Sequence, residues 1–322
     1  MDKKLILAIN GVVSLALVAL ILHLVGLGDV VRELGGVDLG FIALSMLCLL
    51  LMDIIMSYRI SMLLDEMKAG IPFLSIVRSH FVGMLLADFT PSRAGYFATA
   101  AALKYNYGVP ADKALLSIFG PQIFDFTFKV VAGSLAMLYI MLVFIEPEQG
   151  WVLIAGALAV GAVIVVMLLT LFSRRFLALF AFARKLPLLG RLFGVVVKMQ
   201  DSSHVVVRKT PHIIALIFFS WAARAMSWYF AGKSVGISLD TPFPEPLFYF
   251  FLQPLVTMLE FVPSPTIAGL GLSEGGSTLV FSLFGIPPAK AATFALLTRF
   301  KTTFVHLPAV PEAVRVHEGV EL

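Results

Sequence analysis

Charged residues are scarce in this chain. Only 14% of its 322 residues are charged and 59% are hydrophobic, whereas soluble domains carry about 25% charged residues. The mean hydropathy is +0.96. The apolar residues form runs of 20 or more rather than alternating patterns, which predicts helices that cross a membrane. We therefore expect an all-α, polytopic integral membrane protein.

Cysteine is almost absent, because Cys48 is the only one and lies within an apolar run. A single cysteine excludes an internal disulfide and a cluster of thiolate metal ligands. The sequence also lacks a glycine-rich phosphate loop and closely spaced Cys or His pairs. We therefore predict no metal, no cofactor and no enzyme activity, and we expect no nucleic-acid partner because membrane topology accounts for the basic residues.

The apolar runs predict six clear crossings and two broken segments, near 75–103 and 247–284, within a single transmembrane domain over 1–322. One run is too long for an apolar layer of about 30 Å, so we expect it to tilt or break at Gly120–Gln122. The six predicted crossings are Leu5–Val25, Leu39–Tyr58, Ala114–Ile145, Trp151–Phe172, His212–Val235 and Pro288–Pro308.

Lysine and arginine predict the orientation. The link 173–210 is strongly basic, which places it in the cytoplasm, and its mixture of cations and aromatic residues is also typical of a helix lying at the membrane surface. The links on the opposite side of the membrane are acidic. Counting crossings from Lys3 and Lys4 then puts both termini in the cytoplasm of a multi-pass plasma-membrane protein.

Four short motifs occur twice in the same order, which indicates a duplication of 5–145 as 151–310. "MSYR" at Met56 matches "MSWY" at Met226, and "FTPS" at Phe89 matches "FVPS" at Phe261. "IPF" matches "TPF", and "YGVPADKA" matches "FGIPPAKA". A unit with three crossings and one broken segment inverts its second copy. We therefore predict an inverted repeat whose two re-entrant helical hairpins approach each other near the midplane, unless the prolines merely kink a duplicated bundle.

Breaks of this kind are tolerated at depth only where they are buried or line a cavity. The residues that we expect to form the breaks are Pro91, Gly95, Pro263, Pro265, Gly269 and Gly271. Charged residues lie in or beside these breaks, and each needs a partner or a watery cavity. The candidates for binding a substrate head group are Asp88, Arg93, Glu260, Glu274, Arg299 and Lys301, with structural ion pairs as the alternative.

Five other ionisable residues within the apolar runs have simpler interpretations. Asp125 and Lys129 are four residues apart on one helix and can pair with each other. Asp53 is close enough to a helix end to reach the membrane surface. His80 and His306 are isolated histidines, for which packing in the core is the default expectation.

The motifs "FTPSRAGYF", "EFVPSPTIAGLGLSEGG" and "GIPPAKAATFALLTRF" resemble the transmembrane-region family of lysylphosphatidylglycerol synthases, which are flippase-like membrane proteins. The resemblance extends over about residues 5–310. The family pattern Pro-Gly-Gly-Leu-Gly-x-x-Glu corresponds to Pro265, Gly269, Gly271 and Glu274 here, with "TIA" inserted after the proline. In the first motif, Tyr96 stands where an acid is often found.

The resemblance implies translocation of a lipid with a polar head. We expect no aminoacyltransferase domain after Leu322 and therefore no synthesis of the lipid. The sequence predicts a flippase-like transporter whose partners are membrane lipids, either anionic phospholipids or polyprenyl-linked lipids, with a homo-oligomer as a further possibility. The alternatives are a small-solute or ion-coupled secondary transporter and a membrane-embedded enzyme acting on a polyprenyl lipid or phospholipid.

Overall fold

The computed structural model describes residues 3–144, 173–179, 203–258 and 266–321, together with isolated positions at 165, 169, 197, 200 and 201. The predicted crossing Trp151–Phe172 and most of the basic link fall outside the described residues. So do three of the predicted site residues, Glu260, Pro263 and Pro265. Everything described is helical or connects helices, which confirms the all-α class.

The helices follow one another through short connections. Their bounds are α1 Lys3–Val25, α2 Leu27–Gly35, α3 Leu39–Glu66, α4 Phe73–Asp88, η1 Pro91–Phe97, α5 Ala98–Tyr107, α6 Ala111–Phe144, α8 Arg174–Leu179, α10 Ser203–Arg208, α11 Thr210–Ser234, α12 Glu245–Met258, α13 Leu272–Leu283, α14 Pro288–His306, η5 Leu307–Ala309 and α15 Val310–Glu321.

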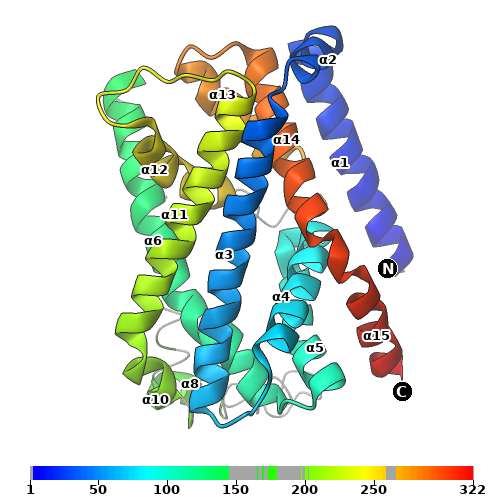
Figure 1. Ribbon diagram of the computed structural model, residues 1–322, viewed down its shortest axis with the longest axis vertical. Helices are drawn as coiled ribbons and strands as arrows, with labels where there is room; N and C mark the ends of the chain where they lie inside the picture. The colour runs from blue at the N-terminus through cyan, green and yellow to red at the C-terminus, as the bar shows by residue number, and fades with distance from the viewer. Residues whose placement is uncertain are drawn as a thin grey trace.

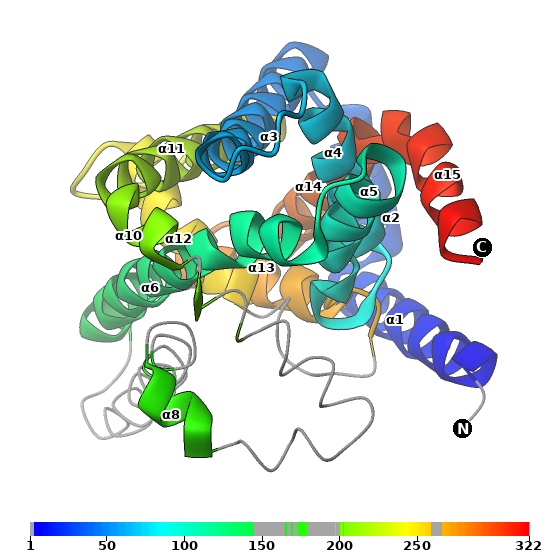
Figure 2. The same ribbon diagram turned by 90° about the horizontal axis from the view of Figure 1, so that it is seen from below.

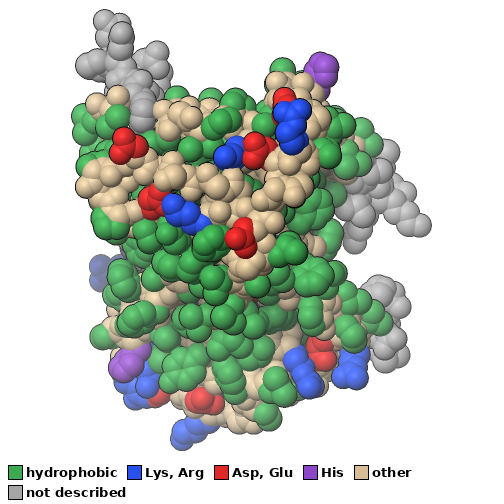
Figure 3. Space-filling view, turned by 45° about the horizontal axis from the view of Figure 1, so that its top comes forward, with side chains coloured by type: hydrophobic (Ala, Val, Ile, Leu, Met, Phe, Trp, Pro, Cys, Tyr) green, Lys and Arg blue, Asp and Glu red, His purple; other side chains and the backbone are tan. Residues whose placement is uncertain are grey.

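Three described helices, α3, α6 and α11, are long and apolar enough to cross a membrane. A fourth crossing is possible if α1 and α2, which meet at an 86° bend, are counted as one bent span. The predicted crossing at Pro288–Pro308 forms α14, but this helix contains Lys290, Arg299 and Lys301 and is not among the candidate spans. Figure 3 shows a belt of hydrophobic side chains across the middle of one face, with charged side chains above and below it.

Helix α6 corrects one expectation. We expected a tilt or a break at Gly120–Gln122, yet α6 continues for 34 residues with Pro121 inside it. At 1.5 Å per residue the helix is about 51 Å long. Gly120 packs against Val206, where an added Cβ would lie 2.7 Å from a methyl group. The proline is therefore accommodated within a continuous helix.

The longest helices form a scaffold on one side of the molecule. In Figure 1, α3 and α11 run side by side along its length, and Figure 2 shows α6 close to α10 and α12. Ser227 on α11 donates from Oγ to the carbonyl of Ser45 on α3 at 2.8 Å. Small hydroxyl residues at this contact let the two backbones approach closely, as is common between membrane helices.

Two broken hairpins lie beside this scaffold. Figure 1 shows α4 and α5 in the lower half of the view and α12 and α13 in the upper half. Each hairpin packs into its own apolar core: Ile76 and Leu103 of the first share a cluster with α3 and α6, whereas Phe248 and Phe281 of the second share one with α11 and α14. The two hairpins therefore pack mainly into different clusters, and Phe250 of α12 contacts both clusters.

The two breaks are in direct contact. The backbone N–H of Ala268 in the second break donates to the carbonyl of Thr90 in the first, at 3.1 Å. This contact agrees with the expectation that the two hairpins approach each other. The duplication and its inversion stay predictions.

Candidate functional site

The first break is produced by Pro91. Thr90 has the extended conformation that a residue before proline favours, with φ −118° and ψ 144°, so α4 ends and the tight helix η1 begins. The Thr90 hydroxyl accepts a hydrogen bond from the Gly95 backbone at 2.6 Å and donates to the Leu86 carbonyl at 2.9 Å. Arg93 has φ +55°, a backbone conformation that residues other than glycine rarely adopt.

The geometry of η1 fixes where the Arg93 side chain points. Its guanidinium donates from Nη2 to Oδ1 of Asp88 at 3.2 Å, and both side chains are almost fully buried. Strained backbone of this kind is often found at functional sites. The first break therefore holds a paired arginine inside the protein.

The second break is held by Glu274 and Arg299. The Glu274 carboxylate accepts from the Gly271 backbone N–H at 2.6 Å and from Arg299 Nε at 2.8 Å. Arg299 also donates to the Ser273 hydroxyl at 2.8 Å and to the Ala268 carbonyl at 3.2 Å. The pair joins the start of α13 and the break before it to α14.

The three residues that the chain inserts after Pro265 make contacts that a shorter turn would lack. Within this insertion, the backbone N–H of Ile267 donates to the Ser14 hydroxyl on α1 at 2.8 Å. The next residue, Ala268, contacts Thr90 and Arg299 and has φ +48°. The insertion thus connects the second break to α1, to α14 and to the first break.

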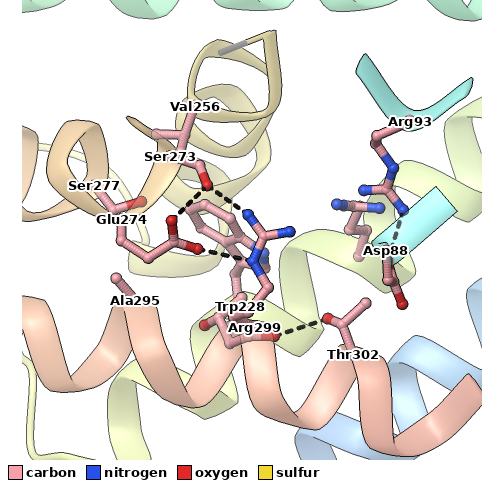
Figure 4. Close-up of a pocket in the computed structure, with 12 residues that line it drawn as sticks. Asp88, Arg93, Trp228, Val256, Ser273, Glu274, Ser277, Ala295, Arg299 and Thr302 are labelled. Carbon is pink, nitrogen blue, oxygen red and sulfur yellow. Dashed lines mark hydrogen bonds and ion pairs between the residues drawn. The ribbon is translucent and has the colours of Figure 1, made fainter. Parts of the chain in front are cut away.

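A small cavity of about 30 Å³ lies where the two breaks meet. Figure 4 shows Arg93 and Asp88 on one side of it and Arg299, Glu274 and Ser273 on the other. The acids of the two pairs come from different hairpins, since Asp88 ends α4 and Glu274 lies in the first turn of α13. The breaks therefore bring four of the predicted site residues to one small cavity.

A larger cavity of about 390 Å³ adjoins the small one and shares Arg93 and Arg224 with it. Its polar lining includes these two arginines together with Asp125 and Lys129 of α6. Its apolar lining comes from several elements and consists of Met52, Met56, Met84, Phe97, Phe119, Phe126 and Trp221, among others. The cavity is therefore amphipathic.

The pairing of Asp125 with Lys129 is confirmed, with 2.9 Å between Oδ2 and Nζ. Trp221 also donates from its indole nitrogen to Asp125 at 2.9 Å. Arg224 lies over the Trp221 ring, 5.8 Å from its centroid. Among the described lining residues of the two cavities, four are basic, Arg93, Lys129, Arg224 and Arg299, and three are acidic, Asp88, Asp125 and Glu274.

Lys301 lies apart from these cavities in the described structure. Its ammonium is buried against the hydroxyl of Ser45 and donates to the hydroxyl and carbonyl of Ser227, at 2.6 and 3.0 Å. The expectation that Lys301 meets Arg93 and Arg299 around one head group therefore differs from the structure. Lys301 follows Arg299 by two residues on α14, which is about 200° around the helix axis. Its side chain therefore points toward the contact between α3 and α11.

Replacing Lys301 by methionine is expected to raise the melting temperature. The substitution removes a buried ammonium that has only neutral oxygens around it, while Ser45 and Ser227 keep each other's backbone carbonyls as acceptors. We expect a gain of about 1 kcal/mol, or roughly 2–4 °C, in thermal unfolding of the purified protein. A lower melting temperature would show that the ammonium stabilises the three-helix contact.

Asp53 does not reach the membrane surface as we expected. Its side chain is fully buried, with Oδ1 3.4 Å from His80 Nε2 and Oδ2 3.3 Å from His306 Nε2. His306 also contacts Asp88, with 2.7 Å between Nδ1 and Oδ2. The expectation that both histidines merely pack in the core is therefore wrong. A buried acid–histidine cluster adjoins the Arg93–Asp88 pair.

Arg224 and this cluster were not predicted as site residues. One signal in the sequence could have found them, because an ionisable residue deep in an apolar run needs a partner. The partners themselves come from helices far apart in the chain, so the sequence does not reveal them. Tyr96, which stands where the related motif often has an acid, lines the larger cavity and packs edge-on against His80 at 5.8 Å.

The fold and its buried charges define a helical membrane protein with a polar site between two broken hairpins. Sequence comparison agrees with this class. The sequence model described as "Lysylphosphatidylglycerol synthase TM region" matches residues 7–309, and the chain belongs to this family. It is also 22% identical over 320 residues to a UPF0104 membrane protein of Pyrococcus horikoshii, an alignment that covers 92% of each chain.

Proposed function

We propose that the protein moves a lipid with an anionic head group between the two leaflets of a membrane, without converting it chemically. The observation that carries this proposal is the amphipathic cavity of about 390 Å³ at the tips of the two hairpins. Its cations offer partners to a phosphate, and its methionine and aromatic lining suits the apolar part of a lipid. The family name links the chain to lipid handling and supports the same class of substrate.

The arrangement of cations suits a phosphate. Arginine donates parallel hydrogen bonds from a planar fork, and lysine adds a compact charge. Arg93 and Arg224 line both cavities, and Lys129 lines the larger one. A phosphate that enters the larger cavity meets these three cations, two of which already contact carboxylates. The head group can then move by exchanging ion-pair partners with these cations, and no unpaired charge has to enter an apolar environment.

The proposed orientation places the lower end of the molecule in Figure 1, toward which the marked C-terminus lies, in the cytoplasm. The charge pattern assigns both termini to that side. The first hairpin then opens to the cytoplasm and the second to the outside. In this arrangement two inverted hairpins surround one site, which can open to the two sides of the membrane in turn. We also propose a plasma-membrane location.

Single cysteines test this orientation. With Cys48 replaced by serine, Arg78→Cys at the exposed base of the first hairpin and Ser238→Cys beside the second are both accessible positions. An impermeant thiol reagent is expected to label Arg78→Cys only from the cytoplasmic side and Ser238→Cys only from outside. Labelling of both variants from one side would contradict the inverted arrangement.

Lipid movement is tested with purified protein in liposomes that contain a trace of fluorescent phosphatidylglycerol. A flippase changes the distribution of the probe between leaflets without altering its chemistry. Flux of a small solute without lipid movement would instead indicate a secondary transporter, and conversion of the lipid would indicate an enzyme. Mass spectrometry of the recovered probe separates movement from conversion.

Arg224→Gln is expected to slow this lipid movement at least tenfold, because an amide replaces a cation that lines both cavities. Arg315→Gln is the matched control, since Arg315 is exposed on α15. Both variants should be compared at equal amounts of folded protein. Equal rates for the two variants would remove Arg224 from the proposed lipid path.

A further inference from the structure

Four buried side chains from three helices form a continuous polar chain next to the cavities. It runs from His80 through Asp53 and His306 to Asp88, with contacts of 3.4, 3.3 and 2.7 Å. His80 and Asp88 belong to α4, Asp53 to α3 and His306 to the end of α14. Asp53, His80 and His306 are each 0% exposed, and Asp88 is 6% exposed.

The contacts of His306 require a dissociable proton in this chain. Both of its ring nitrogens face carboxylate oxygens, which only accept hydrogen bonds when they are ionised. A neutral imidazole can donate through one nitrogen only. Therefore either His306 is an imidazolium ion, or one of the two carboxyl groups carries the proton. In both cases Asp53, His306 and Asp88 together hold one proton that can be released.

Asp88 connects this proton to the cavity. Its Oδ2 contacts His306, whereas its Oδ1 accepts from Arg93 at 3.2 Å. Asp88, Arg93, Glu274 and Arg299 line the small cavity together, as Figure 4 shows. One carboxylate is thus shared between a proton-bearing histidine and a cation placed to meet an anionic head group.

The other end of the chain also has unused hydrogen-bonding capacity. His80 Nδ1 and Arg59 Nε are buried without a hydrogen-bond partner in the described structure. A buried polar atom of this kind is usually satisfied by water or an ion. His80 therefore offers a route by which a proton could reach Asp53.

Titratable and charged groups also lie on the elements that pack around the cluster. They are Arg59 on α3, Arg93 and Tyr96 on η1, Arg224 on α11, Arg299 and Lys301 on α14, and Glu312 on α15, with Glu274 on the adjoining α13. Glu274 accepts a hydrogen bond from Arg299, and Glu312 accepts hydrogen bonds from Asn106 and Tyr107. Among the described residues, no group of three or more His, Cys, Asp or Glu side chains is arranged to hold a metal ion.

We propose that Asp53, His306 and Asp88 form a proton-binding site, and that the protein carries one proton together with each anionic lipid head. This inference rests on the proposed function. A phosphate that contacts Arg93 draws that cation away from Asp88 and adds a negative charge beside it. The Asp88 carboxylate then has the protonated His306 as its remaining cationic partner. Binding of the anion therefore strengthens proton binding, and binding of the proton strengthens anion binding by the same factor.

A pH gradient across liposomes tests the coupling. One proton carried with a singly charged anion is electroneutral, so a gradient of one pH unit can drive up to about a tenfold ratio of fluorescent phosphatidylglycerol between leaflets. The probe is expected to accumulate in the leaflet on the alkaline side. Protein-free liposomes under the same gradient provide the background, because acidic lipids redistribute slowly without protein.

Two variants test the assignment to these residues. Asp53→Asn/His306→Gln removes the shared proton and one negative charge, and is expected to equalise the probe between leaflets without accumulating it. Asp53→Asn alone keeps the His306–Asp88 contact and is the variant to use if the double variant does not fold. It should reduce accumulation of the probe at least threefold. His212→Gln, at an exposed position on α11, is the matched control and should accumulate the probe like the wild type.

The outcomes separate this inference from the function on which it rests. Accumulation by the wild type and by His212→Gln, but not by Asp53→Asn/His306→Gln, supports the coupled proton site. Wild-type protein that only equalises the probe under the pH gradient overturns the coupling and leaves the lipid movement intact. Accumulation that persists in the double variant overturns the choice of residues. Absence of any lipid movement overturns both proposals.

Discussion

Replacing Arg299 by glutamine is expected to lower the free energy of unfolding by about 3–5 kcal/mol, the usual cost of leaving one charge of a buried pair without its partner. Glu274 is 4% exposed, and Arg299 is its cationic partner at 2.8 Å. The substitution also removes donors to Ser273 and to the Ala268 carbonyl. Thermal or denaturant unfolding of the purified protein in detergent measures the loss.

The double variant Arg299→Gln/Glu274→Gln is expected to recover much of this stability, since it removes the uncompensated carboxylate as well. A double-mutant cycle with Glu274→Gln gives the coupling between the two residues. If Arg299→Gln folds as well as the wild type while lipid movement falls, the arginine serves the substrate rather than the hairpin. Arg315→Gln again controls for loss of charge alone.

Replacing Gly95 by alanine is expected to destabilise the protein by about 3 kcal/mol and to abolish lipid movement. A Cβ at this position would lie 2.2 Å from the backbone carbon and oxygen of Leu86, so η1 and α4 would have to separate. Forcing extra volume into a packed site usually costs about 1–3 kcal/mol, and here the obstructing atoms are backbone atoms that cannot rotate away. Separation would also pull Arg93 from Asp88.

Gly28→Ala is the control for this prediction. Gly28 lies inside α2, and a Cβ there would meet no atom within 4 Å. Alanine is expected to leave the stability equal or slightly raised, because it favours the helix more than glycine does. Equal melting temperatures for Gly95→Ala and Gly28→Ala would show that the first hairpin can open at its tip without cost.

The sequence predicted the features that depend on neighbours along the chain. Pro91 ended α4 because a proline restricts the residue before it, and Asp125 paired with Lys129 because positions four apart share one face of a helix. The predicted break at Pro121 was wrong because the effect of a proline on a long helix depends on what packs around it. Here neighbours such as Val206 pack against α6 beside the proline.

The parts of the site that depend on packing between distant helices were only partly predicted. Glu274 and Arg299 were candidates, but the choice between substrate contact and ion pair required their geometry. Asp53 and His306 are 253 residues apart, and nothing in either local sequence indicates that they meet. Lys301 was misplaced because its direction depends on how α14 rotates against α3 and α11, which a charge pattern does not define.

The contact between the two breaks also defines an energy scale for opening the site. Among the described residues, one backbone hydrogen bond, from Ala268 to Thr90, joins the tips of the two hairpins. A bond of this type contributes about 0.5–1.5 kcal/mol net. At room temperature this contribution alone favours the joined tips by only about twofold to thirteenfold. Because Glu274 and Arg299 hold the second break to α14, thermal motion can part the tips while each hairpin keeps its own shape.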